Sequence, residues 1–178
     1  YSTLVRMSTV ASIHDFAGRC DLALPIARTV RERMAARYGE ARQATLVETG
    51  NLGFRERDCG DRDAGIAWLR QAESGLRRHY GEDNVAAHSF RYALAHLLAD
   101  EGRYAEALRM AEGLDLDALT AASSTPVWDG RLRALRGRIL VLSGDDAAGR
   151  PLLSEAVQAM EAGGFEDEED IAPLRALL

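Results

Sequence analysis

Small and apolar residues recur along this chain at a fixed interval, and that interval sets the elements that the sequence predicts. Glycines stand at positions 18, 60, 102 and 144, each 42 residues after the one before. In stretches of about 12–16 residues on either side of these glycines, apolar residues recur every three or four positions, as on the buried face of a helix. The pattern predicts a helix before each glycine and a second helix after it.

The four helices that precede the glycines have similar predicted lengths. They are Leu4–Ala17, Leu46–Cys59, Val85–Glu101 and Val127–Ser143. A small residue stands seven positions before each glycine and another five positions after it, in the pairs Ala11/Ala23, Gly53/Gly65, Ala95/Ala107 and Gly137/Gly149. Facing small residues let two helices approach closely, and a glycine adopts a positive φ at little cost. Each glycine is therefore predicted to be the turn of a helix hairpin.

The connectors between hairpins support this interpretation. Tyr38-Gly39-Glu40 and Tyr80-Gly81-Glu82 are predicted to end the first two hairpins, with Asp83 or Asn84 capping the next helix. Residues 121–126 replace this connector after the third hairpin.

The last third of the chain carries its own helix signals. Thr125 is predicted to cap a helix that has Pro126 at its first position. Gly163-Gly164 is expected to close the fourth hairpin, and an acidic run follows at Glu166–Asp170. The segment Ile171–Leu178 is predicted to cover the end of the last hairpin, because a terminal repeat otherwise exposes an apolar face to water.

One hairpin cannot bury its own apolar face, so neighbouring hairpins are expected to stack and share a core. The sequence predicts an all-α protein of the α-solenoid class. It is expected to form a single domain over residues 1–178, with repeats at about 3–40, 43–82, 84–122 and 126–164 and a cap at 168–178.

These features resemble the tetratricopeptide repeat (TPR), whose common form has a 34-residue period. The longer period, the connector Tyr-Gly-Glu-Asp-Asn and the segment GRYAEAL at Gly102–Leu108 are similar to the kinesin-light-chain type. Pro25 and Pro151, each seven residues after a glycine, agree with that type. The resemblance covers about residues 3–164, and it is broken at Arg136, where a Leu is usual.

The resemblance implies a concave face, formed by the first helix of each hairpin, that binds an extended peptide or a partner helix. The candidate binding residues are Asn51, Phe54, His88, Tyr92, His96, Arg131 and Arg138. Asn51 could hold a peptide backbone, the aromatic residues could seat an apolar side chain, and His96 and the arginines could meet a carboxylate. The alternative for the two arginines is that they are solvated or pair with neighbouring acids.

Charge and the arrangement of titratable residues narrow the function. The net charge is −6, and a generic nucleic-acid binder usually carries a basic face. No apolar run reaches the roughly 20 residues of a membrane span. His88 and His96 would lie about 12 Å apart on one helix, too far to share a metal. No catalytic site, metal or cofactor is predicted, and the chain is not expected to be an enzyme.

The two cysteines, Cys20 and Cys59, are too few for a disulfide framework or a zinc site, so they are predicted to be free, part-buried thiols. A cytoplasmic location is expected, with the extracytoplasmic part of a membrane-anchored protein as the alternative. Because the chain opens on Tyr1, it is expected to be part of a larger protein.

The predicted function is a protein–protein interaction module within a bacterial signalling or regulatory protein, with a protein or peptide as partner. The alternatives are a ligand-sensing domain that controls an attached effector and a self-assembling structural element, and a homo-oligomer fits the last of these. Nucleic acid and membrane insertion are not expected for this segment.

Overall fold

Helices make up the fold throughout the part of the chain that is described. The computed structural model describes residues 1–121, 128–162 and 168–178. The helices are α1 (Ser2–Phe16), α2 (Cys20–Tyr38), α3 (Gln43–Cys59), α4 (Arg62–Tyr80), α5 (Val85–Asp100), α6 (Tyr104–Glu112), α7 (Leu116–Ala121), α8 (Trp128–Leu142), α9 (Asp146–Ala162) and α10 (Glu168–Arg175). The predicted cap at Thr125 and Pro126, the Gly163-Gly164 turn and the start of the acidic run lie outside the described residues.

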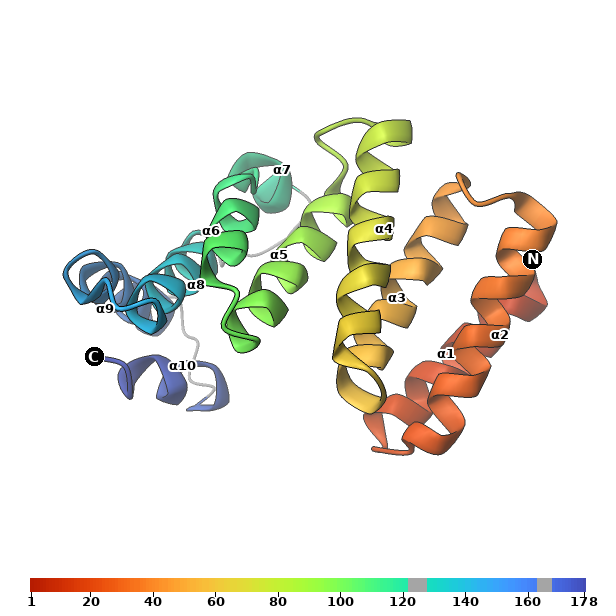
Figure 1. The fold of residues 1–178 in the computed structure, drawn as a ribbon, viewed down its shortest axis with the longest axis horizontal. Coiled ribbons are helices and arrows are strands. Elements are labelled where there is room, and N and C mark those ends of the chain that lie inside the picture. Colours follow the sequence, from red (N-terminus) through yellow and green to blue (C-terminus); the bar gives the residue numbers. More distant parts are fainter. Residues whose placement is uncertain (122–127, 163–167) are drawn as a thin grey trace. The chain divides into compact units, whose positions relative to one another are not determined.

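The chain divides into two compact units, Tyr1–Arg91 and Tyr92–Leu178, with the boundary inside α5. In the first unit α1 pairs with α2 and α3 with α4, and α2 also packs on α3 (Figure 1). In the second unit α8 pairs with α9, α6 and α7 pack on α8, and α10 packs on α9. The all-α class is therefore confirmed, whereas a single domain over residues 1–178 stays a prediction.

The small residues lie where the two helices of a hairpin approach most closely. A Cβ atom added to Gly65 would lie 3.0 Å from the carbonyl oxygen of Gly53, and one on Gly149 would lie 2.8 Å from that of Gly137. Ala11 and Ala23, the corresponding pair in the first hairpin, are fully buried. Close packing of these helices requires small side chains, as the spacing predicts.

Three of the four predicted turn glycines adopt a positive φ, which is +66° at Gly18, +71° at Gly102 and +93° at Gly144. The prediction is wrong at Gly60, whose φ is −140°. There the helix α4 begins instead through Asp61, whose carboxylate accepts hydrogen bonds from the N–H groups of Asp63 and Ala64. A side chain at position 60 would be crowded, because a Cβ there would lie 2.4 Å from Oε2 of Glu56.

The connectors after α2 and α4 follow the prediction. Gly39 and Gly81 end these helices with φ of +87° and +97°. Of the two candidate caps for α5, Asn84 is the one that acts, since its Oδ1 accepts a hydrogen bond of 3.1 Å from the N–H of Ala87.

The helix predicted after Gly102 is interrupted. The helix α6 ends at Glu112, and α7 begins after a short turn in which Asp115 accepts a hydrogen bond from the N–H of Ala118. The break leaves the last carbonyl groups of α6 without partners inside the helix. Arg136 of α8 donates a hydrogen bond of 3.2 Å to one of them, that of Ala111. This contact gives Arg136 a role at the position where the resembling repeats carry Leu.

The end of the second unit is covered as the sequence predicts. Ile171 and Leu174 of α10 are buried in the same apolar cluster as Leu153, Val157 and Met160 of α9. The helix α10 therefore shields the apolar face that α9 would otherwise expose.

Candidate functional site

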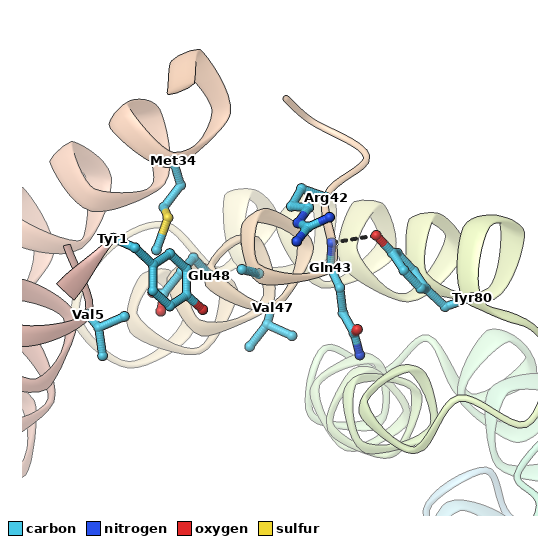
Figure 2. A pocket seen from close by; sticks show the side chains of 9 residues that line it. Tyr1, Val5, Met34, Arg42, Gln43, Val47, Glu48 and Tyr80 are labelled. Carbon is cyan, nitrogen blue, oxygen red and sulfur yellow. Dashed lines mark hydrogen bonds between the residues drawn. The ribbon is translucent and has the colours of Figure 1, made fainter. Parts of the chain in front are cut away.

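A hollow of about 580 Å³ opens in the first unit near the start of α3 (Figure 2). It is lined by Tyr1, Val5, Met34, Arg42, Gln43, Ala44, Val47, Glu48 and Tyr80. Tyr1 and Val5 are exposed at its edge, whereas Met34 is buried. Both polar and apolar side chains line the hollow, which is large enough for a bulky side chain.

Two of the lining residues are charged, Arg42 and Glu48. Arg42 is exposed at the start of α3 and makes no capping bond with its side chain. Glu48 is half-buried and accepts a hydrogen bond of 2.9 Å from Ser8 of α1. The cation therefore faces solvent, while the carboxylate is already held by its own chain.

Tyr80 fixes the start of α3 from the end of α4. Its hydroxyl accepts a hydrogen bond of 2.7 Å from the N–H of Gln43 and donates one of 3.1 Å to the carbonyl of Ala41. The first of these bonds is drawn in Figure 2. A second hollow of about 740 Å³ shares Gln43 and Tyr80 with the first and reaches Val85 and Ser89 of α5. The two hollows adjoin at Tyr80 and pass the beginnings of α1, α3 and α5.

A polar seam joins α1 to α3 beyond the first hollow. Arg55 is buried and donates a hydrogen bond of 2.7 Å to Ser12, and its Nε lies 3.7 Å from Oδ2 of Asp15. Together with the bond between Ser8 and Glu48, these contacts fix how the second hairpin is seated against α1.

The prediction of free cysteines is wrong, because Cys20 and Cys59 form a disulfide. Cys20 is the first residue of α2 and Cys59 is the last residue of α3. The two helices pack against each other and run in opposite directions, so these ends meet although they are 39 positions apart in the sequence. Among the described residues no cysteine is free.

The structure places the predicted binding residues of the first unit in different surroundings. Asn51 is half-buried on α3. The centres of the Phe54 and Phe90 rings are 5.7 Å apart. The guanidinium of Arg57 lies over the Phe54 ring, 5.3 Å from its centre. His88 is only 4% exposed, so its imidazole belongs to the packed interior and is not an accessible contact. None of these three side chains lines the first hollow.

In the second unit, three of the four predicted residues gather around a residue that the sequence did not single out. Trp128 lies edge-on to Tyr92 with ring centres 5.3 Å apart, and Tyr92 lies 4.7 Å from the His96 ring. Arg131 lies over the Trp128 ring at 5.9 Å. The signal for Trp128 was its place at the start of a predicted first helix, where Ala86 stands in the preceding repeat.

Arg138 lies apart from this aromatic group. Its guanidinium pairs with Asp100 at 2.5 Å, and both side chains are partly exposed. This is the alternative that the sequence left open for the arginines. Ala93 and Leu135, which stand in the third and fourth repeats where Asn51 stands in the second, are buried.

The titratable side chains of the described residues do not form a metal centre. In the described ranges, no group of three or more His, Cys, Asp or Glu side chains is placed to hold a metal ion. Arg91 and Glu73, whose side chains are 11% and 8% exposed, pair at 2.5 Å and join α5 to α4.

The pairing of the helices defines an all-α protein built from helix hairpins of the solenoid class. Comparison of the sequence with models of protein families and with curated proteins finds no match. Solved structures do match. A kinesin light chain-like protein from Podosopora anserina with nearly identical TPR-like repeats has a TM-score of 0.79 at 14% identity, covering 99% of this chain and 87% of that one.

A second crystal structure, of a variant of that protein, gives a TM-score of 0.76 at 15% identity and covers 99% of this chain and 94% of its own. The chain therefore has the TPR-like repeat fold, as its 42-residue period predicts.

Proposed function

We propose that this chain is a protein–protein interaction module that holds an extended peptide segment of its partner across the two adjoining hollows. TPR-like folds generally serve protein–protein interaction. The observation that carries the proposal is that the two hollows adjoin, since they share Gln43 and Tyr80 and pass the beginnings of three helices.

The lining residues suggest how a peptide is held. The first hollow suits an apolar side chain, which would contact Val5 and Val47. The side-chain amide of Gln43, exposed between the two hollows, can donate to and accept from a peptide backbone. Arg42 adds a cation that a partner carboxylate can meet.

The test is to select peptides against the chain from a random library and to titrate the tightest one by calorimetry. Val47→Glu places a charge in the first hollow and should weaken binding at least about tenfold, or about 1.4 kcal/mol. Leu178→Glu is the control, because Leu178 lies outside both hollows and is 45% exposed. Equal affinity of the wild type and Val47→Glu contradicts the proposal.

The aromatic group of the second unit supplies a competing surface, which contains the predicted residues Tyr92, His96 and Arg131. Trp128→Ala should leave the affinity of the selected peptide unchanged if the hollows are the site. A loss on Trp128→Ala, with no loss on Val47→Glu, assigns binding to this aromatic group instead. Asn51 and Arg138 stay predicted contacts, tested by their Ala variants in the same titration.

We further infer an oxidising compartment, which is the extracytoplasmic alternative that the sequence left open. The support is the disulfide between Cys20 and Cys59, since such bonds persist outside the reducing cytosol. In the described part of the chain, no helix combines the length and the hydropathy of a membrane crossing. Alkylating the native protein without reductant should label neither cysteine, and labelling of both contradicts the inference.

The wider setting that we propose is a larger bacterial signalling or regulatory protein, in which this module brings a partner to an attached domain. Measuring the mass of the native gene product tests this setting, and a product that consists of this module alone contradicts it.

A further inference from the structure

The outer face of α1 is apolar and exposed. Val10, Ile13 and Phe16 are 43%, 60% and 93% exposed, and Val5 and Tyr1 extend the exposed surface toward the start of the helix. This is more apolar surface than any other described helix of the chain shows, and such a surface on one helix commonly marks an interaction site.

The repeat itself shows what covers the same face one period later. The positions of α3 that correspond to Arg6, Val10, Ile13 and His14 of α1 are Glu48, Leu52, Arg55 and Glu56. All four contact the preceding hairpin. Glu48 and Arg55 bond to Ser8 and Ser12 of α1, Leu52 shares an apolar cluster with Ala27 of α2, and Glu56 pairs with Arg28 of α2 at 2.7 Å.

Burial follows from this covering hairpin. Leu52 and Arg55 are 2% and 4% exposed, whereas Val10 and Ile13 at the same positions of α1 are largely open to solvent. The corresponding positions of α1 and α3 therefore differ in burial because the first hairpin packs on this face of α3.

The charges on the α1 face specify the hairpin that fits. Where α3 carries the carboxylates of Glu48 and Glu56, α1 carries Arg6 and His14, so both positions change from acidic to basic. Where α3 carries Arg55, α1 carries the apolar Ile13. A fitting hairpin therefore has a carboxylate opposite Arg6, another opposite His14, and apolar side chains between them.

The geometry points to the outer face of α1 as a docking surface for a helix hairpin of a partner protein, one with an apolar stripe flanked by two carboxylates. A second copy of this chain fits less well. Seating its own first hairpin there would place Arg28 opposite His14 and the hydroxyl of Ser12 against Ile13. Val10, Ile13 and Phe16 line neither of the two hollows. Tyr1 and Val5, at the edge of this surface, also line the first hollow.

The experiment fuses a probe hairpin ahead of Tyr1 through a flexible linker of about 20 Gly and Ser residues, which raises its effective concentration to the millimolar range. The matched probe is a copy of residues 1–41 with Ser8→Glu, Ser12→Leu, Cys20→Ser and Arg28→Glu. The mismatched probe has Ser8→Arg, keeps Arg28, and carries the same Ser12→Leu and Cys20→Ser changes.

The matched fusion should melt about 3 °C or more above the mismatched one. Val10→Asp in α1 of the chain should remove this gain, and Val85→Asp on α5, which is 38% exposed, should keep it. Equal melting temperatures of the two fusions overturn the proposal, and so does a gain that survives Val10→Asp. Sedimentation of the unfused chain should show a monomer, and a dimer that Val10→Asp dissolves overturns the choice of occupant in favour of a second copy.

Discussion

Gly50 lies directly beneath the ring of Phe90, at the place where α5 meets α3. A Cβ atom at this position would lie 2.2 Å from Cζ of Phe90 and within 2.5 Å of two further ring atoms. Phe90 is 4% exposed and also contacts Phe54, so its ring has little room to move aside. The missing side chain of Gly50 is therefore a packing requirement.

Gly50→Ala should destabilise the protein by about 1–3 kcal/mol through overpacking, although Ala is the better helix former by about 1 kcal/mol. The control is Gly130→Ala on α8, where the nearest atom is Cγ of the flexible Met160 at 3.2 Å. That variant should be neutral or more stable. Urea unfolding of both variants measures the difference, and a stable Gly50→Ala variant contradicts the packing argument.

The disulfide is the second feature that acts at the scale of single residues. It closes a loop of 39 residues, and the chain-entropy relation gives a stabilisation of about 4 kcal/mol for a loop of that length. The variant Cys20→Ser/Cys59→Ser should lose most of this in urea unfolding. A reductant should lower the stability of the wild type by a similar amount and leave the variant unchanged. A reductant that affects neither protein contradicts the assignment of the bond.

At the scale of elements, the connector between α4 and α5 is held by an ion pair. Nε of Arg77 donates a hydrogen bond of 2.6 Å to Oε2 of Glu82, just beyond the Gly81 turn. This hydrogen bond lowers the pKa of Glu82 below its ordinary value of 4.5 and raises the pKa of Arg77. The exposed pair therefore links the connector to the last turn of α4.

The sign of the pH dependence follows from the lowered pKa of Glu82. Its contribution to stability is complete above pH 4.5 and is lost as the pH falls through the lowered value. Glu82→Gln should melt slightly below the wild type at neutral pH, and the two melting temperatures should converge in acid. Calorimetric scans over this pH range test it, and a difference that grows in acid contradicts it.

The elements that the sequence predicted best are those set by local packing. Gly53 with Gly65 and Gly137 with Gly149 meet as expected, because close approach of two helices of one hairpin depends on residues near the turn. The break between α6 and α7 was missed, since Leu114 is in phase with the apolar positions of an uninterrupted helix. The turn at Gly60 was misjudged because a crowded glycine and a left-handed one look the same in a sequence.

At the scale of the whole molecule, the chain is a series of local packing units, and its disulfide lies in only one of them. In repeat folds each element depends mainly on its neighbours, so a local loss of stability need not spread along the chain.

Hydrogen exchange should show this locality. Cys20→Ser/Cys59→Ser should lose amide protection in α1 to α3, while α8 and α9 keep most of theirs. Mass spectrometry of peptic fragments gives the comparison. A uniform loss of protection along the chain contradicts local unfolding.

The candidate site was less predictable than the fold. Tyr92, His96 and Arg131 come together as residues of the first helices, but the burial of His88 depends on the side of α5 that it occupies, which the period does not fix. The hollow beside Val47 depends on Tyr80, which comes from the end of a different helix. The pairing of Cys20 with Cys59 requires the mutual placement of α2 and α3, which spacing alone does not reveal.

The same disulfide has a mechanical consequence. A chain pulled from its two ends can extend only through residues outside the closed loop, so the segment between the cysteines, which are 39 positions apart, adds no length while the bond is intact. A fully extended backbone of that length would span about 130 Å, and none of this length is available while the bond is intact. Reduction under load would release that length in one step, so α2 and α3 are the part of this protein that is protected from being drawn out.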